Sequence, residues 1–143
     1  MVNGHTISWL LDSDVSIQYQ VQRDLLNNND PELQKRILTE GWGKKLLSFR
    51  KQNGHWALGF YQPKWTSSHY TLLDIKNLNP VKDHPLIQES IYNIAENEKG
   101  HDGGINPSGT VNESDVCING MLLNYASYFQ TSEKQLKSVI DFI

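Results

Sequence analysis

The stretch "ESDVCINGMLLNYASYF", residues 113–129, places Asp115 two positions before Cys117, the chain's only cysteine, at the start of an apolar helical pattern. A carboxylate and a thiolate are both zinc ligands, so the pair is half of a candidate metal site. Aspartate is also a preferred N-cap residue, and a free cysteine commonly packs as a small apolar side chain. We favour the cap-and-core interpretation, because scattered ligands without a dense motif are a weak metal signature.

Aromatic residues crowd a long segment earlier in the chain. In some enzymes such rings stabilise a cationic intermediate by cation–π attraction, but more often they pin a loop onto helices, and we favour the second role. His55 and His101 lie in similar glycine-rich loops, where solvated histidines are the default. The aromatic residues concerned are Trp56, Phe60, Tyr61, Trp65 and Tyr70.

The other acidic and glycine-rich motifs do not form a catalytic set. The chain has neither the D-x-D-D nor the D-D-x-x-D pattern. Asp12 and Asp14 stand just ahead of a helical pattern, where carboxylates favour the helix N-terminus. "GHDGG", residues 100–104, has neither a preceding strand nor a lysine-serine partner, so we interpret it as a turn and not as a phosphate loop.

Composition narrows the class of protein. A length of 143 residues indicates one domain with a sizeable core. The net charge of −3, with 13 basic residues spread along the chain, argues against nucleic acid as a partner. No stretch approaches the roughly 20 apolar residues of a transmembrane helix. The absence of a signal-peptide pattern and a single cysteine together predict a cytoplasmic protein without internal disulfides.

Apolar residues recur at helical spacing, which predicts an all-α fold. Ser13 or Asp14 can cap a first helix that carries Ile17, Val21 and Leu25 on one side. Further helices are expected from Pro31 to the glycines at 41–43, and then over residues 42–51, 68–78, 85–99, 115–129 and 132–143.

The helical pattern repeats. Gly54 and Gly103 align at an offset of 49 residues (103 − 54), and the same shift brings Leu72 onto Met121. Each copy predicts a helix, a glycine turn, a long polar loop and a second helix, which is typical of a helical-hairpin array. We therefore expect one helical-repeat domain over 1–143, with repeat units at approximately 42–80 and 85–130 and a partial third unit at 131–143.

The helix expected over 115–129 is apolar nearly all round, so we predict that it is buried. Its small or polar residues are spaced three, four and three apart, which places them on one face. That face is expected to line a central lumen or to contact a neighbouring backbone. The residues of this stripe are Cys117, Gly120, Asn124 and Ser127.

Two segments, "KQNGHWALGFYQPKWTSSHYTLLDIKNL" and "KGHDGGINPSGTVNESDVCINGMLLNYASYF", together resemble the prenyltransferase and squalene-oxidase repeat. This repeat builds the α/α toroids of terpenoid cyclases and protein prenyltransferases. "QNGHW" at 52–56 is similar to the family's Q-x-x-D-G-x-W turn, and "HDGGI" at 101–105 is a weaker copy without the tryptophan. Looser similarity, from "SWLLDSDVSIQYQVQRDLL" onwards, is to bacterial proteins of the superfamily.

The resemblance implies about half of a toroid, because the family's ring usually takes about six hairpins. An open half-ring would expose a large apolar patch. We therefore expect that the chain is a fragment of a longer toroid or closes its lumen by self-association, for instance as a homodimer.

The resemblance also implies the candidate site residues. In protein prenyltransferases an Asp-x-Cys pair and a histidine bind zinc; Asp115 and Cys117 match the pair, whereas the family's histidine has no counterpart in this sequence. His69, which the 49-residue offset aligns with Ile118, is the candidate third ligand of a zinc ion. The candidates for contact with a ligand in the lumen are Cys117, Asn124, Tyr70 and Trp65. The expected function is terpenoid cyclase-like or prenyltransferase-like: binding or transforming a prenyl or other apolar small molecule. The alternative is a non-catalytic helical module for protein interaction or self-association.

Overall fold

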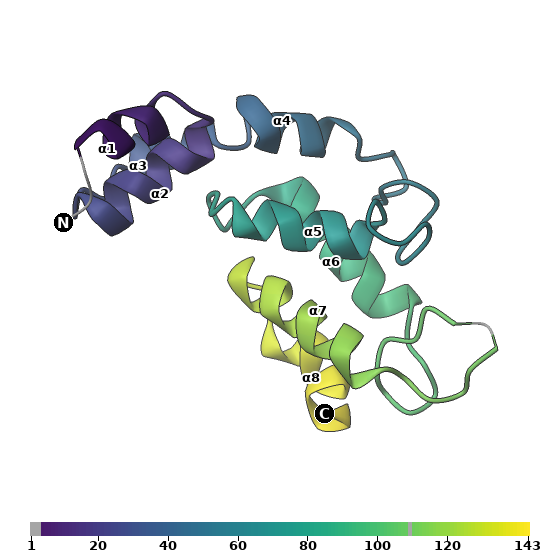
Figure 1. Ribbon diagram of the computed structural model, residues 1–143. Coiled ribbons are helices and arrows are strands. Elements are labelled where there is room, and N and C mark those ends of the chain that lie inside the picture. Colours follow the sequence, from purple (N-terminus) through teal and green to yellow (C-terminus); the bar gives the residue numbers. More distant parts are fainter. Residues whose placement is uncertain (1–3, 109) are drawn as a thin grey trace. The chain divides into compact units, whose positions relative to one another are not determined.

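The computed structural model describes residues 4–108 and 110–143 (Figure 1). Within these ranges the chain is helical and forms no strand, which confirms the all-α prediction; one isolated antiparallel bridge joins Lys99 and Ile105. The helices are α1 (Gly4–Leu11), α2 (Val15–Leu25), α3 (Pro31–Arg36), α4 (Gly41–Ser48), α5 (Ser68–Asn77), α6 (Pro85–Asn97), α7 (Val116–Tyr128) and α8 (Glu133–Phe142).

The chain divides into two compact units. The first comprises Met1–Phe49 and Asn77–Val81, and the second comprises Arg50–Lys76 and Lys82–Ile143. The predicted repeat unit at 42–80 is thus shared between them, because α4 belongs to the first unit and most of α5 to the second. A single helical-repeat domain stays a prediction.

In the first unit, Asp14 connects the starts of two helices. Its Oδ1 accepts a hydrogen bond from the Ser16 backbone N–H at 2.9 Å and so caps α2 as predicted, while its Oδ2 accepts one from the Trp42 N–H of α4 at 2.9 Å. Gly41 lies against this carboxylate with a φ of +52°, and a Cβ there would lie 2.0 Å from Asp14 Oδ2. Only glycine meets both conditions without displacing the cap.

The core of the first unit differs from the expected apolar side of α2. Val15 and Tyr19 are buried with Leu33 and Ile37, and Leu78 packs against this cluster. Of the three residues that we expected on the buried side, Val21 is buried, whereas Ile17 and Leu25 are 37% and 45% exposed. The reason is that Tyr19 turns inward, where its large ring occupies the core, and its hydroxyl reaches Asn29 at 3.1 Å.

Two other helices of the first unit depart from the expected ranges. Helix α1 was not predicted. It contains no buried residue, so packing imposes no buried apolar face that its sequence pattern could reveal. Helix α3 begins at Pro31 as expected but ends at Arg36, ahead of the glycines at 41–43.

The second unit holds the elements around the candidate site. The turns before its two long loops contain Gly54 and Gly103, whose φ angles of +83° and +92° match the equivalence that the 49-residue offset predicts. Asp115 caps α7, and Ser132 with Gln135 forms a reciprocal capping box at α8. These local signals place the helix starts where the sequence predicts them.

Helix α7 is half-buried and not surrounded by core. Its buried side consists of Ile118, Asn119, Leu122, Tyr125 and Ala126. The predicted stripe does share one face, but all four of its residues are exposed, and so is Val116 at 60%. The prediction of a fully buried helix was wrong, because the second unit supplies packing partners for one side of α7 only.

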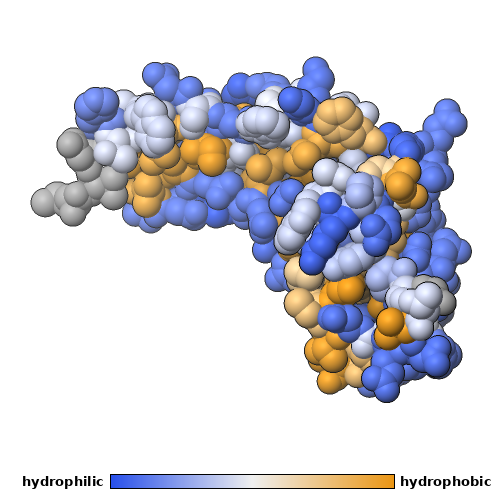
Figure 2. Space-filling model, turned by 45° about the vertical axis from the view of Figure 1, so that its right-hand side comes forward, coloured by the Kyte–Doolittle hydropathy of each residue, from blue (hydrophilic) through white to orange (hydrophobic). Residues whose placement is uncertain are grey.

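Apolar side chains interrupt the polar surface at several points, seen as orange among blue on the visible face in Figure 2. No helix within 4–108 and 110–143 combines the length and the apolar character needed to cross a membrane.

Candidate functional site

The three candidate zinc ligands occupy different environments. Asp115 Oδ1 accepts a hydrogen bond from the Ile118 N–H at 3.1 Å, which confirms its predicted role as the cap of α7. Cys117 is an exposed free thiol, so the prediction that it packs in the core was wrong. His69 is fully buried. In the described part of the chain no three His, Cys, Asp or Glu side chains converge as a metal site, and this set is not brought together.

His69 lies inside an aromatic cluster of the second unit. Its ring meets those of Phe60, Tyr70 and Tyr125 edge-on at centroid distances of 5.1–5.8 Å, and the Tyr61 ring lies 5.6 Å away. Its Nδ1 lies 3.4 Å from the Tyr125 hydroxyl, and its Nε2 has no hydrogen-bond partner among the described residues. Burial lowers the pKa of His69 to about 4, so the imidazole is neutral at pH 7.

The four candidate lumen residues fall into two separate groups. The rings of Tyr70 and Trp65 pack at a tilt of 47° with centroids 4.8 Å apart, and Trp65 remains 69% exposed. Cys117 and Asn124 lie on the exposed face of α7. The aromatic pair pins the first loop to the start of α5, as the loop-pinning interpretation expects.

A groove lies between the two long loops of the second unit, at the N-terminal end of α7. We call it the interloop groove, and its volume is about 540 Å³. The four candidate lumen residues are not part of its lining, whereas Asp115 is. The lining consists of Tyr61, Gln62, Asn106, Pro107, Ser108, Val111, Glu113, Ser114, Asp115 and Ile118.

Asn119 holds the second loop in place from inside the unit. Its Oδ1 accepts a hydrogen bond from the buried Ile105 N–H at 2.6 Å, and its Nδ2 donates to the Ile105 carbonyl at 3.0 Å. The same Nδ2 donates to the Asp115 carbonyl at 2.9 Å. One fully buried amide therefore joins the loop to the first turn of α7. Asn119 was not among the predicted site residues, because an asparagine in an apolar helix has no spacing motif of its own.

Asp102 provides a second anchor for the same loop. Its carboxylate accepts hydrogen bonds from the Ser114 N–H and hydroxyl, both at 2.7 Å, and from the Gly104 N–H at 3.1 Å. The bonds from Ser114 lower the pKa of Asp102, which stays ionised at pH 7. The wall of the groove is therefore formed before any ligand arrives.

The charge of the interloop groove is negative. Glu113 and Asp115 are in its lining, and the lining contains no lysine, arginine or histidine. The hydrogen bond to Tyr70 and burial both raise the pKa of Tyr61, so that phenol stays neutral and able to donate a hydrogen bond. Apolar surface comes from the Tyr61 ring, Pro107, Val111 and Ile118. Such a site suits a largely apolar molecule whose polar end is neutral or cationic.

Taken together, the fold and this groove define an all-α protein with a preformed surface site in its second unit. Comparisons of the chain with models of protein families, with curated proteins and with solved structures found no match.

Proposed function

We propose that this protein binds a small, largely apolar molecule, such as a prenyl alcohol, in the interloop groove. The observation that carries the proposal is the groove itself, which falls within the range of about 300–1,000 Å³ typical of small-molecule sites. Apolar walls and a few fixed polar groups are combined there in the way such sites require. The proposal concerns binding, and no reaction is part of it.

The charges refine the class of ligand. A prenyl diphosphate would place several negative charges beside the carboxylates of Glu113 and Asp115, where the lining contains no cation to offset them. Like charges at neighbouring positions repel each other, so the diphosphate is disfavoured in this groove. A neutral alcohol or a cationic amine avoids this repulsion, and the amine would also be attracted by the two carboxylates.

The relation to the prenyltransferase and terpenoid-cyclase repeat is part of the same proposal. It is supported by the order of helix, glycine turn with positive φ, long loop and helix, which occurs twice along the chain. A cytoplasmic location also belongs to the proposal, supported by the exposed free thiol of Cys117, which a reducing compartment keeps unpaired.

The test compares geraniol, geranylamine and geranyl diphosphate by isothermal titration calorimetry against the full chain. Geraniol and geranylamine are expected to bind, and the diphosphate is expected to bind more weakly than either. Equal or tighter binding of the diphosphate would contradict the charge argument, and no binding of any of the three would contradict the proposal.

A pair of valines provides the matched variants. Val111 lines the groove and is 57% exposed, whereas Val116 lies outside its lining and is 60% exposed. Val111→Asp adds a charge to the apolar wall and is expected to weaken geraniol binding about tenfold, which is roughly 1.4 kcal/mol. Val116→Asp is expected to leave binding unchanged. Similar losses in both variants would place the ligand elsewhere.

Self-association is the second candidate function, favoured by a different observation. Exposed apolar side chains lie at the start of α7 and at the end of α8, among them Val116 at 60%, Ile140 at 45% and Ile143 at 57%. Grouped apolar exposure marks protein interaction sites. Native mass spectrometry tests this candidate, because a dimer that Ile140→Lys dissociates would support it and a monomer across micromolar concentrations would exclude it.

A further inference from the structure

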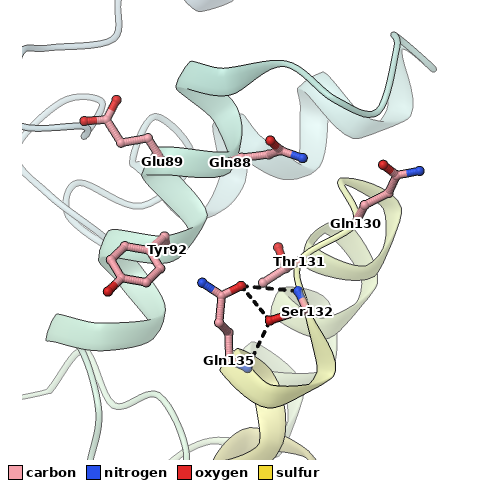
Figure 3. A pocket seen from close by; sticks show the side chains of 7 residues that line it. All are labelled: Gln88, Glu89, Tyr92, Gln130, Thr131, Ser132 and Gln135. Carbon is pink, nitrogen blue, oxygen red and sulfur yellow. Dashed lines mark hydrogen bonds between the residues drawn. The ribbon is translucent and has the colours of Figure 1, made fainter.

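A second groove lies on the second unit, between α6 and the turn that joins α7 to α8 (Figure 3). We call it the amide groove, and its volume is about 360 Å³. It shares no lining residue with the interloop groove, so it does not depend on the ligand proposed there. Its lining consists of Gln88, Glu89, Tyr92, Gln130, Thr131, Ser132 and Gln135.

The lining of the amide groove is almost entirely uncharged and polar. Three glutamine amides and the hydroxyls of Tyr92, Thr131 and Ser132 offer both donors and acceptors. Glu89 is the one charged lining residue, and its Oε2 already accepts a hydrogen bond from Arg50 at 2.8 Å. The groove lining therefore offers no cation to a phosphate.

Hydrogen bonds fix several of these side chains. Gln135 Oε1 accepts from the Ser132 N–H at 3.3 Å and the Ser132 hydroxyl at 2.9 Å, so the amide nitrogen is left as the free end. Figure 3 shows that nitrogen turned away from Ser132, toward α6. Gln88 Nε2 donates to the Phe129 carbonyl at 3.1 Å, which uses one of its two hydrogens.

The turn at the far side of the amide groove is also well defined. Gln130 takes a φ of +61°, and the Thr131 N–H donates to the Ala126 carbonyl at 3.0 Å. This left-handed closure of α7 places Gln130, Thr131 and Ser132 along one rim. The rim and the α6 residues Gln88 and Tyr92 thus border the groove on opposite sides (Figure 3).

Tyr92 adds a flat aromatic surface at the α6 side. It is 46% exposed, which leaves part of its ring open to a ligand. A ligand that matches the groove needs several neutral hydroxyls around its edge and a carbon face that packs on a ring. We propose that the amide groove binds a neutral pyranose sugar, whose hydroxyls bond to the glutamine amides and whose C–H face lies on Tyr92.

The test is a titration of the ¹⁵N-labelled full chain with methyl β-glucopyranoside and methyl β-galactopyranoside, followed by chemical-shift changes. Saturable changes confined to residues 86–92 and 129–135, with a Kd in the range of about 1–10 mM, are expected for so open a site. Glycerol, which has hydroxyls but no ring, is the control and is expected to produce no saturable change. Absence of saturation with both sugars up to about 50 mM would overturn the proposal.

Variants of Tyr92 separate ring stacking from general contact. Tyr92→Leu keeps an apolar side chain and a good helix former but removes the flat ring, and a loss of about tenfold in sugar affinity is expected. Tyr92→Phe keeps the ring and is expected to bind within about twofold of the unchanged chain. Phe49→Leu, at an exposed aromatic residue outside the lining of both grooves, is the control and is expected to have no effect.

Two results would refute this assignment even if shifts occur. Equal sugar affinity in Tyr92→Leu and Tyr92→Phe would show that the ring does not bind the sugar. Shifts caused by a blocked tetra-alanine peptide but by neither sugar would assign the amides to a peptide backbone. The spectra of the variants report folding directly, so a lost site is distinguished from a lost fold.

Discussion

Replacement of Asn119 by alanine tests whether one buried amide holds the loop that forms the interloop groove. Asn119 is fully buried, as is Ile105, and the hydrogen bonds of the Ile105 N–H and carbonyl both go to this amide. Asn119→Ala leaves these two backbone groups without their partner. The Asp115 carbonyl keeps its helical bond from the Asn119 N–H at 3.1 Å, so it is not orphaned.

The magnitude follows from the two orphaned groups. A buried donor or acceptor that loses its partner costs about 1–3 kcal/mol, so the pair costs about 2–6 kcal/mol. This is a large fraction of the 5–15 kcal/mol by which ordinary domains are stable. We therefore expect Asn119→Ala to lower the free energy of unfolding of the second unit severely and to weaken geraniol binding with it.

Asn124 supplies the matched control, because it is the same residue type on the same helix but on the exposed face. Asn124→Ala is expected to change stability by less than about 0.5 kcal/mol. Urea unfolding followed by circular dichroism measures both variants, and hydrogen exchange of the Ile105 amide reports the loop alone. A difference below about 1 kcal/mol between the two variants, with Ile105 still protected, would refute the reasoning.

Three further predictions concern the candidate metal residues. The pKa of His69 is depressed from 6.5 to about 4, so the unfolded chain binds its proton first and stability falls as pH drops from about 6.5 toward 4. This loss amounts to on the order of 3 kcal/mol, and denaturation curves across that range are expected to show it in the unchanged chain and to lack it in His69→Phe. Asp115→Ala is expected to cost about 1 kcal/mol through loss of the cap, and Asp115→Asn much less, so equal melting temperatures for all three chains would contradict the capping role. The exposed Cys117 thiol is expected to react with a disulfide reagent in the folded chain as fast as in urea, and strong protection in the fold would contradict its exposure.

Local signals in the sequence determined most of the helix starts. Asp14, Asp115 and Ser132 cap helices, and Pro31 and Pro85 begin them, because each effect depends only on neighbouring backbone groups. The positive φ at Gly54 and Gly103 is local in the same sense. The all-α fold was therefore predictable, and so was Asp115 as a cap.

Only the tertiary structure decided which side of each helix is buried and where the grooves lie. Cys117 and Asn124 belong to the stripe of α7 that we predicted to be buried. Both are exposed, because the second unit packs against the opposite side of the helix. Asn119 and His69 acquire their roles from residues far away in the sequence: Ile105 for one, Phe60 and Tyr125 for the other. Periodicity identifies residues that share a face, but burial depends on what packs against that face, and contacts between distant segments determine this.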